Sequence, residues 1–449
     1  MTPQVEVANP VAESLVLGAC LVDQDAIVFV SDVTSPKDFH VPANRWMAEA
    51  IWECLSHREP PTLGAVITRL QAMGRWSDRT APDKICRTDL DNAILAVSDG
   101  DIEHAVTNAK QVREAAFRRN GKRLLNKLSE SFSDLKLSPD DVQKHVTESI
   151  GKIFDGNGER DSSLAAIGEE EEQRIESMAD GELPGVTCGL AWLDELTSGF
   201  LPGETWIIAG AYKQRKTTAM LNMILAAAQA GAGITIFTNG DSSRASTYRK
   251  LLSMMMNQAM IGESDEYPST VSSTTLQYRI KDERYAFLKQ ICMDKLHQLP
   301  IRLKDGKDGV GDLRECTRIL RRDVALHGTR IFVYDFAQAI NYGANDYDRT
   351  TYFSSWIQNM AGETGTTGIG ISQVNEQTIV GGEDSYSPGA KGGGALPAAA
   401  NIFLVTSYQK PLLTVKLKLA RDAQMGSKVS HTVNPASGLI LDSHLVLGK

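Results

Sequence analysis

The first third of the chain carries apolar and amphipathic segments of helical length. Spacing of this kind is typical of helices that bury one face. A basic stretch at residues 113–127 lies within the last of these segments, and we interpret it as a solvated helix face. We therefore predict a small all-α N-terminal domain over residues 1–155. The candidate helices are residues 11–21, 42–55, 63–73, 90–97 and 102–155.

The composition changes at residues 156–163, where the sequence GNGERDSS holds two glycines and almost no apolar side chain. This composition is typical of a flexible linker. Residues 164–178 then form one amphipathic segment with consecutive glutamates at 169–172. We predict a linker with an interdomain helix over residues 156–184. The helix would be either a plain spacer or an arm that docks on a neighbouring subunit.

From residue 185 onward, short β-branched or apolar segments alternate with helical ones. Such alternation favours a mostly parallel sheet that is covered by helices on both faces. Residues 185–449 are thus predicted to form a larger α/β domain. Its candidate strands are residues 205–209, 234–238, 331–334, 368–372 and 402–407, and its candidate helices include 217–230 and 310–325.

Composition narrows the class of protein. Hydrophobic residues make up 42% and charged residues 23%, which is typical of a globular protein. No run approaches the roughly 18 apolar residues of a membrane helix, and the start lacks the basic region of a secretory signal. Six scattered cysteines predict buried thiols in a reducing compartment, not structural zinc. The net charge of −9 excludes a generally basic DNA-coating protein but allows a locally basic loop.

The strand predicted at 205–209 leads into the sequence GAYKQRKT, which begins at Gly210, and a helix is predicted to follow. A strand, a tight loop ending in Lys-Thr and a helix cradle nucleotide phosphates, because backbone N–H groups and the helix N-terminus face the anion. Lys216 would reach the β- and γ-phosphates, and Thr217 would ligate Mg²⁺. The usual pattern has glycine immediately before the lysine, whereas this chain has Arg215.

The loop carries unusual positive charge. Lys213 and Arg215 add two cations to Lys216, and we include them with Thr218 among the nucleotide-binding residues. Arg215 supports two opposite hypotheses: it grips phosphate oxygens, or it plugs the site. The Arg215→Gly substitution separates them, since loss of ATP affinity supports gripping and gain supports plugging.

Two acidic residues complete the predicted chemistry. Asp335 ends an apolar strand, which is where the acid that holds Mg²⁺ through water is expected. Asp241 follows the strand predicted at 234–238, and we take it as the candidate general base that activates water. As alternatives, either residue would be an ordinary turn aspartate.

Several long segments, taken together in order and spacing, carry a family resemblance. They include GVTCGLAWLDELTSGFLPGE before the phosphate loop and LPIRLKDGKDGVGDLRECTRILRRDVALHGTRIFVYDFAQAI around Asp335. In the front domain they include AESLVLGACLVDQDAI and SPKDFHVPANRWMAEAIWE. The chain resembles the hexameric replicative helicases of the DnaB type along nearly its whole length. The resemblance implies a RecA-like P-loop core, with ATP and Mg²⁺ as cofactors.

The resemblance also implies roles for four later residues. Gln373 would sense the γ-phosphate, and Gln338 would sit beside the active site. Arg421, with Lys418, looks like the finger that reaches into the neighbouring subunit's nucleotide, where it would stabilise transition-state charge. The lysine is shifted by one residue from the family's usual pair, and the alternative is a basic strand on a solvated edge.

In the same family, loops of the rear domain bind single-stranded DNA in a central channel. The matching segments are residues 341–350, which include Arg349, and residues 378–394, which include Lys391, Gly392 and Gly393. Backbone amides and a few cations per subunit, repeated around a ring, would track phosphates without base specificity. Alternatively, these loops are mere connections.

Two functions remain open at this stage. The favoured one is an ATP-driven homohexameric DNA helicase that works with single-stranded DNA, a helicase loader and a primase. The resemblance implies that it acts in the cytoplasm of a bacterial cell or a phage-infected host. The alternative is a hydrolysis-deficient ring or adaptor that binds nucleotide or DNA. Its support comes from the departures at Arg215, Asp241 and Lys418.

Overall fold

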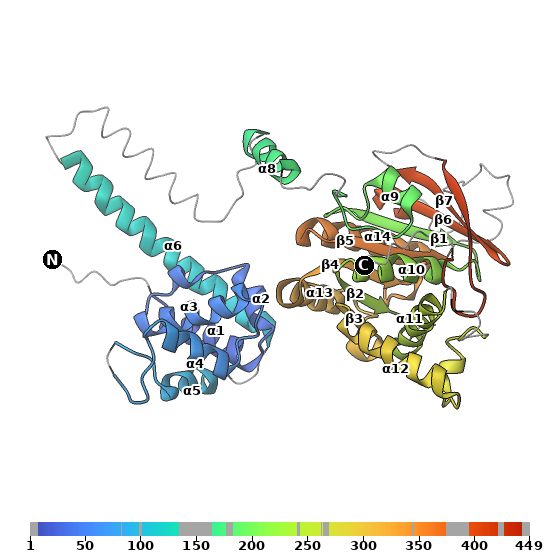
Figure 1. Ribbon diagram of the computed structural model, residues 1–449. Helices are drawn as coiled ribbons and strands as arrows, with labels where there is room; N and C mark the ends of the chain where they lie inside the picture. Colours follow the sequence, from blue (N-terminus) through green and yellow to red (C-terminus); the bar gives the residue numbers. More distant parts are fainter. Residues whose placement is uncertain are drawn as a thin grey trace. The chain divides into compact units, whose positions relative to one another are not determined.

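The computed structural model divides the chain into two compact units, Met1–Ser177 and Met178–Lys449, called here the front unit and the rear unit (Figure 1). All six cysteines are buried free thiols, which confirms that part of the prediction. In the part of the chain that is described, no helix is long and apolar enough to cross a membrane. The structure describes residues 8–81, 83–97, 101–133, 164–176, 183–239, 243–261, 263, 269–343, 345–373, 395–420 and 426–441.

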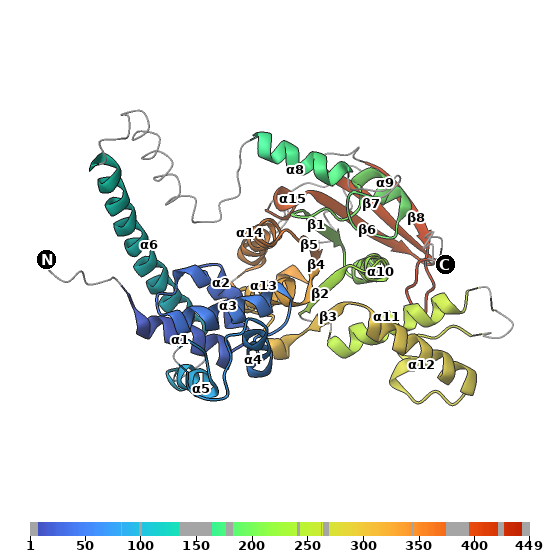
Figure 2. The ribbon, with the colours of Figure 1, turned by 60° about the vertical axis from the view of Figure 1, so that its left-hand side comes forward.

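The described part of the front unit contains helices and no strands (Figure 2), which confirms the predicted all-α class. Helix α1 packs against α3, α5 and α6, and the core includes Leu17, Ile27, Ile51 and Leu70. The helices are α1 (Pro10–Val22), α2 (Ala26–Ser31), α3 (Pro42–Ser56), α4 (Leu63–Ala72), α5 (Arg87–Leu95), α6 (Ile102–Ser133) and α8 (Leu164–Glu176).

A buried carboxylate joins two of these helices. Glu13 of α1 is 1% exposed. Its oxygens accept hydrogen bonds from the backbone N–H of His40 at 2.7 Å and of Val41 at 3.1 Å, and from the side-chain amide of Asn44 at 3.1 Å. A buried charge is tolerated when its lone pairs are satisfied in this way. The bonds fix the entry of the chain into α3.

The basic stretch at residues 113–127 is not simply a solvated face, so that prediction is wrong in part. Arg119 is 5% exposed and donates to the backbone carbonyl of Asp38. Arg113 donates to the carbonyl of Val33 at 2.8 Å. Both arginine side chains therefore donate hydrogen bonds to backbone carbonyl groups in the segment between α2 and α3. Sequence periodicity does not reveal such contacts. Phe117, in the same stretch, is 57% exposed.

The rear unit is built on one sheet of eight strands in the order β3-β2-β4-β5-β1-β6-β7-β8. The first six are parallel, and β7 and β8 extend the sheet in antiparallel pairing. The predicted mostly parallel α/β core is therefore confirmed. The strands are β1 (Thr205–Gly210), β2 (Gly233–Thr238), β3 (Ile301–Lys304), β4 (Thr329–Asp335), β5 (Thr367–Gln373), β6 (Ile402–Gln409), β7 (Leu412–Ala420) and β8 (Lys428–Thr432).

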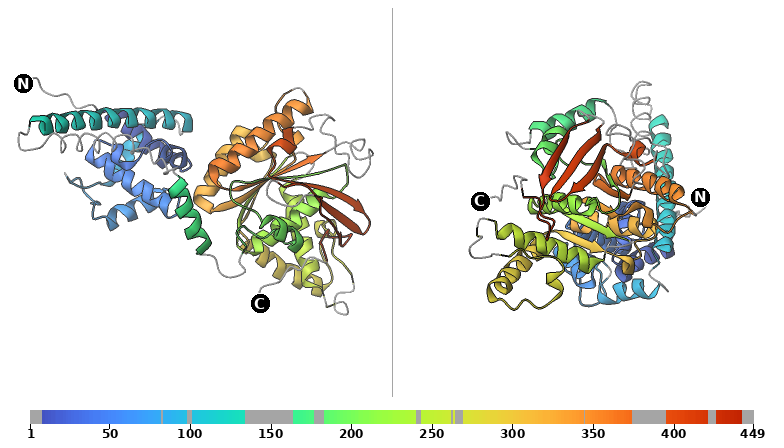
Figure 3. Two further views of the ribbon diagram at one scale, coloured as in Figure 1. Left: turned by 90° about the horizontal axis from the view of Figure 1, so that it is seen from above. Right: turned by 90° about the vertical axis from the view of Figure 1, so that its right-hand side faces the viewer.

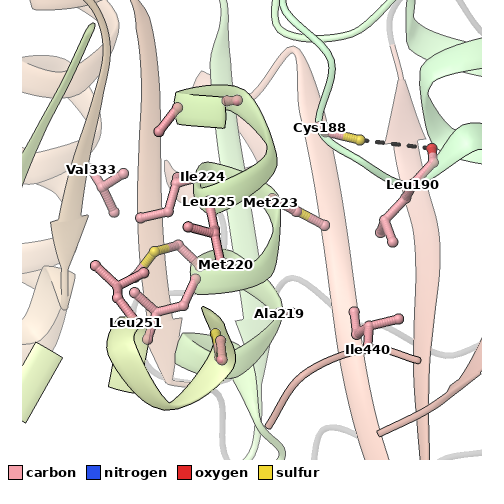
Figure 4. Close-up of a cluster of buried hydrophobic side chains, with 14 of the residues drawn as sticks. Cys188, Leu190, Ala219, Met220, Met223, Ile224, Leu225, Leu251, Val333 and Ile440 are labelled. Carbon is pink, nitrogen blue, oxygen red and sulfur yellow. Dashed lines mark hydrogen bonds between the residues drawn. The ribbon is translucent and has the colours of Figure 1, made fainter. Parts of the chain in front are cut away.

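Helices cover both faces of this sheet, as Figure 3 shows. Side chains alternate along each strand, so Trp206 and Ile208 of β1 enter the cluster under α10, α11 and α12. Ile207 and Ala209 enter the opposite cluster, under α13, α14 and α15. Figure 4 shows the first cluster around α10. The helices are α9 (Ala191–Thr197), α10 (Lys216–Gln229), α11 (Arg244–Ala259), α12 (Glu283–Gln298), α13 (Leu313–His327), α14 (Asp346–Thr364) and α15 (Ala395–Ala399).

Residues late in the chain fasten α10 to the body of the domain. The side-chain amide of Asn222 donates to the carbonyl of Gly438 at 2.9 Å, and its oxygen accepts from the backbone N–H of Ile440 at 2.9 Å. Asn434 reaches Asn257 of α11 at 3.4 Å. The helix that begins at the phosphate loop is thus held by the segment that follows β8.

One loop is shorter than the sequence predicted. Residues 346–350 belong to the first turns of α14 and not to a loop. The side chain of Asn345 accepts from the N–H of Asp348 at 2.9 Å, and this cap starts the helix. The connection between β4 and α14 therefore ends at residue 345. Residues 378–394 lie outside the described residues.

Candidate nucleotide-binding site

The predicted phosphate loop follows the carboxyl end of β1. This strand lies inside the sheet, between β5 and β6, and its last residue, Gly210, pairs with Gln373 at the end of β5. Ligands of parallel α/β sheets bind at the carboxyl ends of the strands. Helix α10 starts at Lys216, so its positive N-terminal end faces the same edge.

A cavity of about 520 Å³ opens at this edge. Its volume is within the range of small-molecule sites. Its walls come from the phosphate loop and the ends of β4, β5 and β6. The lining residues are Tyr212, Lys213, Gln214, Arg215, Lys216, Thr217, Thr218, Asp335, Phe336, Ile371, Gln373 and Tyr408.

Thr217 and Asp335 meet in this cavity although they are far apart in the sequence. The hydroxyl of Thr217 donates to a carboxylate oxygen of Asp335 at 3.1 Å. Asp335 is 5% exposed. A hydroxyl and a carboxylate are the hard oxygen donors that Mg²⁺ prefers, and Mg²⁺ commonly keeps several waters and takes its other oxygens from phosphates. The donor set therefore fits Mg²⁺ carried by a nucleotide.

Lys216 points back across the loop. Its Nζ donates to the carbonyl of Ala211 at 2.8 Å. Burial lowers the pKa of Lys216, and the charge of Asp335 opposes that shift. An ammonium group has three N–H donors, and this bond uses one of them. The loop therefore presents a desolvated cation at the cavity, which strengthens its attraction for a phosphate.

Sequence reasoning missed a second lysine beside this carboxylate. Burial lowers the pKa of Lys250 on α11, and the charge of Asp335 opposes that shift too. The charge of Asp335 thus acts on lysines of two helices, Lys216 of α10 and Lys250 of α11. No motif marks Lys250, because it lies in an ordinary helical stretch, and only the packing of α11 brings it near the site.

Arg215 has a backbone conformation that a side chain disfavours. Its φ is 57° and its ψ is 27°, in the left-handed region that glycine adopts freely. For a residue with a side chain this conformation costs about 1–2 kcal/mol. Its guanidinium carbon lies 4.8 Å from the centroid of the Tyr408 ring. Sequence reasoning did not place Tyr408 in the site.

Gln338 and Gln373 form a bridge between the ends of β4 and β5. The Gln338 amide donates to the hydroxyl of Ser372 at 2.9 Å and to the carbonyl of Gln373 at 3.1 Å. The backbone N–H of Gln373 donates back to Gln338 at 3.4 Å. These bonds connect the segment that follows β4 to the end of β5.

Lys418 and Arg349, two further described residues of the prediction, do not line this cavity. Lys418 lies on β7, is half-buried and does not line the cavity. Arg349 lies on α14, where it donates to the carbonyl of Tyr342 at 3.2 Å. Among the described residues, no cluster of histidine, cysteine and acidic side chains could hold a metal ion by itself. Asp241, Arg421, Lys391, Gly392 and Gly393 lie outside the described residues.

Comparison with known proteins assigns the family. The model of the DnaB-like helicase C terminal domain matches residues 185–381, and that of the DnaB-like helicase N terminal domain matches residues 5–87. The chain belongs to the DnaB-like helicase family. The two matches fall on the rear and front units, so the resemblance found in the sequence is confirmed.

Two relatives agree with this assignment. The replicative DNA helicase DnaB of Leifsonia xyli subsp. xyli is 24% identical over 370 residues, which cover 81% of this chain and 76% of that protein. The DnaB of Geobacillus stearothermophilus is 24% identical over 218 residues, which cover 47% of this chain and 46% of that protein.

Two solved structures share the fold of this chain. One, described as a DnaB-like replicative helicase and its interactions with primase, has a TM-score of 0.51 at 16% identity and covers 96% of this chain and 99% of that one. The other, described as an ATPase domain, has a TM-score of 0.51 at 17% identity and covers 63% of this chain and 100% of that one.

Proposed function

We propose that this chain is an ATP-driven, ring-shaped replicative DNA helicase that translocates on single-stranded DNA and unwinds the duplex at the fork. Membership of the DnaB-like helicase family supports this class of activity. The observation that carries the proposal is the convergence of Lys216, Thr217 and Asp335 on one cavity at the carboxyl edge of the sheet. Phosphoryl transfer needs positioned cations and an oxygen-ligated metal more than covalent chemistry.

Each residue has a role that follows from its place. Loop amides and the N-terminus of α10 would hold phosphate oxygens, and Lys216 would pair with the β- and γ-phosphates. Thr217 and Asp335 would hold Mg²⁺, which when bound neutralises charge that develops on the phosphates. Gln373, at the end of β5, would contact the γ-phosphate, and Gln338 would carry that contact to the end of β4.

Catalysis is proposed to need two neighbouring chains. Asp241 would accept a proton from the attacking water, and Arg421 would enter the next subunit's site together with Lys418. On this proposal the active form is a homohexameric ring, in which each site borrows an arginine from the neighbouring chain. An arginine supplied from a neighbour stabilises transition-state charge and couples hydrolysis around a ring.

DNA contact is proposed for the segments that leave the carboxyl edge of the sheet. Residues 341–345, with Arg349 at the start of α14, follow β4, and Lys391, Gly392 and Gly393 come after β5. Cations and backbone amides at these positions would contact phosphates, so affinity would be sequence-independent and would fall with added salt. A helicase loader and a primase are the further partners we propose, in the cytoplasm of a bacterial cell or a phage-infected host.

ATP hydrolysis by the purified chain, with and without single-stranded DNA, tests the proposal. We expect turnover that DNA stimulates and that Lys216→Ala abolishes. Lys295→Ala, which removes an exposed lysine of α12, is the matched control and should leave turnover unchanged. Turnover that survives Lys216→Ala would place hydrolysis elsewhere.

One observation favours a second function, that of a ring or adaptor that binds nucleotide or DNA but hydrolyses ATP poorly. The left-handed conformation of Arg215 puts a long cationic side chain where the usual loop has only backbone. Assembly and DNA binding without turnover would support this second function.

A further inference from the structure

Two successive residues of the phosphate loop contact the same residue of β6. The side-chain oxygen of Gln214 accepts a hydrogen bond from the backbone N–H of Tyr408. The guanidinium of Arg215 lies over the Tyr408 ring, 4.8 Å from its centroid. Strand β6 runs parallel to β1 and continues beyond it to Gln409, so Tyr408 lies alongside the loop.

The loop needs such contacts because of its own sequence. Lys213 has a φ of 61° and Arg215 a φ of 57°. Glycine adopts this left-handed region at no steric cost, whereas the region is sterically disfavoured for a residue with a Cβ. Where glycine stands before the lysine, the backbone alone permits the turn. In this chain the turn at Arg215 carries a cost of about 1–2 kcal/mol, which a contact from outside the loop can offset.

The two contacts make different demands on residue 408. Any residue except proline supplies the N–H that Gln214 accepts. The contact with Arg215 requires an aromatic face, and its distance is that of a cation–π interaction. The Tyr408 hydroxyl is buried and has no hydrogen-bond partner in the described part of the chain. The ring, and not the hydroxyl, therefore carries the contact.

We propose that Tyr408 is a positioning residue that does in this chain what glycine does in the usual loop. Its ring stabilises Arg215 in the left-handed conformation and so sets the path of residues 211–215 into Lys216. This inference rests on the proposed nucleotide site. Tyr408 and Arg215 both line the cavity. A nucleotide would therefore bind to the loop conformation that their contact stabilises.

Hydrogen exchange of the ligand-free protein tests the positioning role without any nucleotide. Tyr408→Leu keeps the backbone N–H and a large apolar side chain but removes the aromatic face. We expect amide exchange over residues 211–216 to rise by about 2- to 30-fold, the range that the strength of an arginine–aromatic contact gives. Tyr408→Phe keeps the face and should match the wild type. Equal exchange in the leucine variant and the wild type would overturn the proposal.

A double-mutant cycle with MgATP tests the link to Arg215. Tyr408→Leu should weaken ATP binding by about 2- to 30-fold in the wild-type background. It should have little effect in the Arg215→Gly background, because glycine adopts the turn without help. Equal losses in the two backgrounds would overturn the proposal and would show a general packing role for Tyr408.

The two measurements also separate this inference from the proposed function. Suppose that Tyr408→Leu raises amide exchange over residues 211–216 and Tyr408→Phe does not, while the wild-type chain binds no MgATP. That result would support the positioning role and refute the nucleotide site. Thermal unfolding of every variant shows whether each is folded. Tyr408→Phe keeps the test decisive if Tyr408→Leu does not fold, since loss of loop protection with phenylalanine would refute a role for the ring.

Discussion

Gly210→Ala should damage the fold and the phosphate site together. The added Cβ would lie 2.8 Å from the hydroxyl oxygen of Thr406, 2.9 Å from the carbonyl oxygen of Thr406 and 3.2 Å from Cγ of Lys216. The hydroxyl can rotate away. The carbonyl cannot, because it belongs to β6, which is hydrogen-bonded to β1 on one side and to β7 on the other.

The cost follows from this geometry. Inserting a methyl group into a packed interior that cannot give way costs about 1–3 kcal/mol. Separating β1 from β6 would relieve the clash, but it would also move the start of the loop. The Lys216 side chain must yield by a few tenths of an ångström, so we expect weaker binding of ATP in addition to the loss of stability.

Gly362→Ala is the matched control in the same unit. Gly362 lies on an exposed face of α14, and a Cβ there would meet nothing within 4 Å. Alanine in a helix is more favourable than glycine by about 1 kcal/mol. In urea unfolding we expect Gly210→Ala to lower the free energy of unfolding and Gly362→Ala to raise it. ATP titration of both variants measures the expected loss of affinity in Gly210→Ala. A Gly210→Ala protein that unfolds at the wild-type urea concentration, with wild-type ATP affinity, would refute the reasoning.

Three further predictions concern single side chains. Asp335→Asn should raise the Mg²⁺ concentration needed for turnover by about 10- to 100-fold, as shown by Mg²⁺ titration. Asp323→Ala removes a fully buried acceptor of the Thr235 hydroxyl and should cost about 1–3 kcal/mol in urea unfolding. Burial, then nearby arginine and lysine charges, lowers the pKa of His327 below 6.5. Folding stability should therefore fall as the pH drops below 6.5, where the unfolded imidazole gains a proton. His327→Gln should flatten that slope, and an unchanged slope would contradict the assignment.

The central strands could be predicted from the sequence because they are covered on both faces. Strands β1 and β2 are buried at every position, and their sequences, TWIIAG and GITIFT, consist of apolar residues, glycine and the β-branched threonine. Strand β3 has only four half-buried residues, too few for a pattern. In β7, buried Leu413, Val415 and Leu417 alternate with half-exposed polar residues. That alternation is present in the sequence, and the lysines at positions 410, 416, 418 and 428 indicate, as one alternative, a basic strand on a solvated edge.

The site was predictable where chemistry follows directly from a strand end. Lys216, Thr217 and Asp335 each stand at or just after such an end, and parallel strands bring those ends together. Tyr408 and Lys250 could not be found in this way. Tyr408 reaches the cavity through the length of β6, whereas Lys250 is brought within the electrostatic influence of Asp335 by the packing of α11. Both placements depend on tertiary structure and not on local pattern.

The fastening of α10 by the segment after β8 has a consequence for synthesis of the chain. Strand β1 and the phosphate loop are made early, but β1 pairs with β5 and β6, which are made much later. Gly438 and Ile440, which form hydrogen bonds with the Asn222 side chain, are made later still. A chain still on the ribosome therefore has the loop sequence without a finished site. The front unit, whose helices contact one another within residues 10–133, can fold while the rear unit is being made.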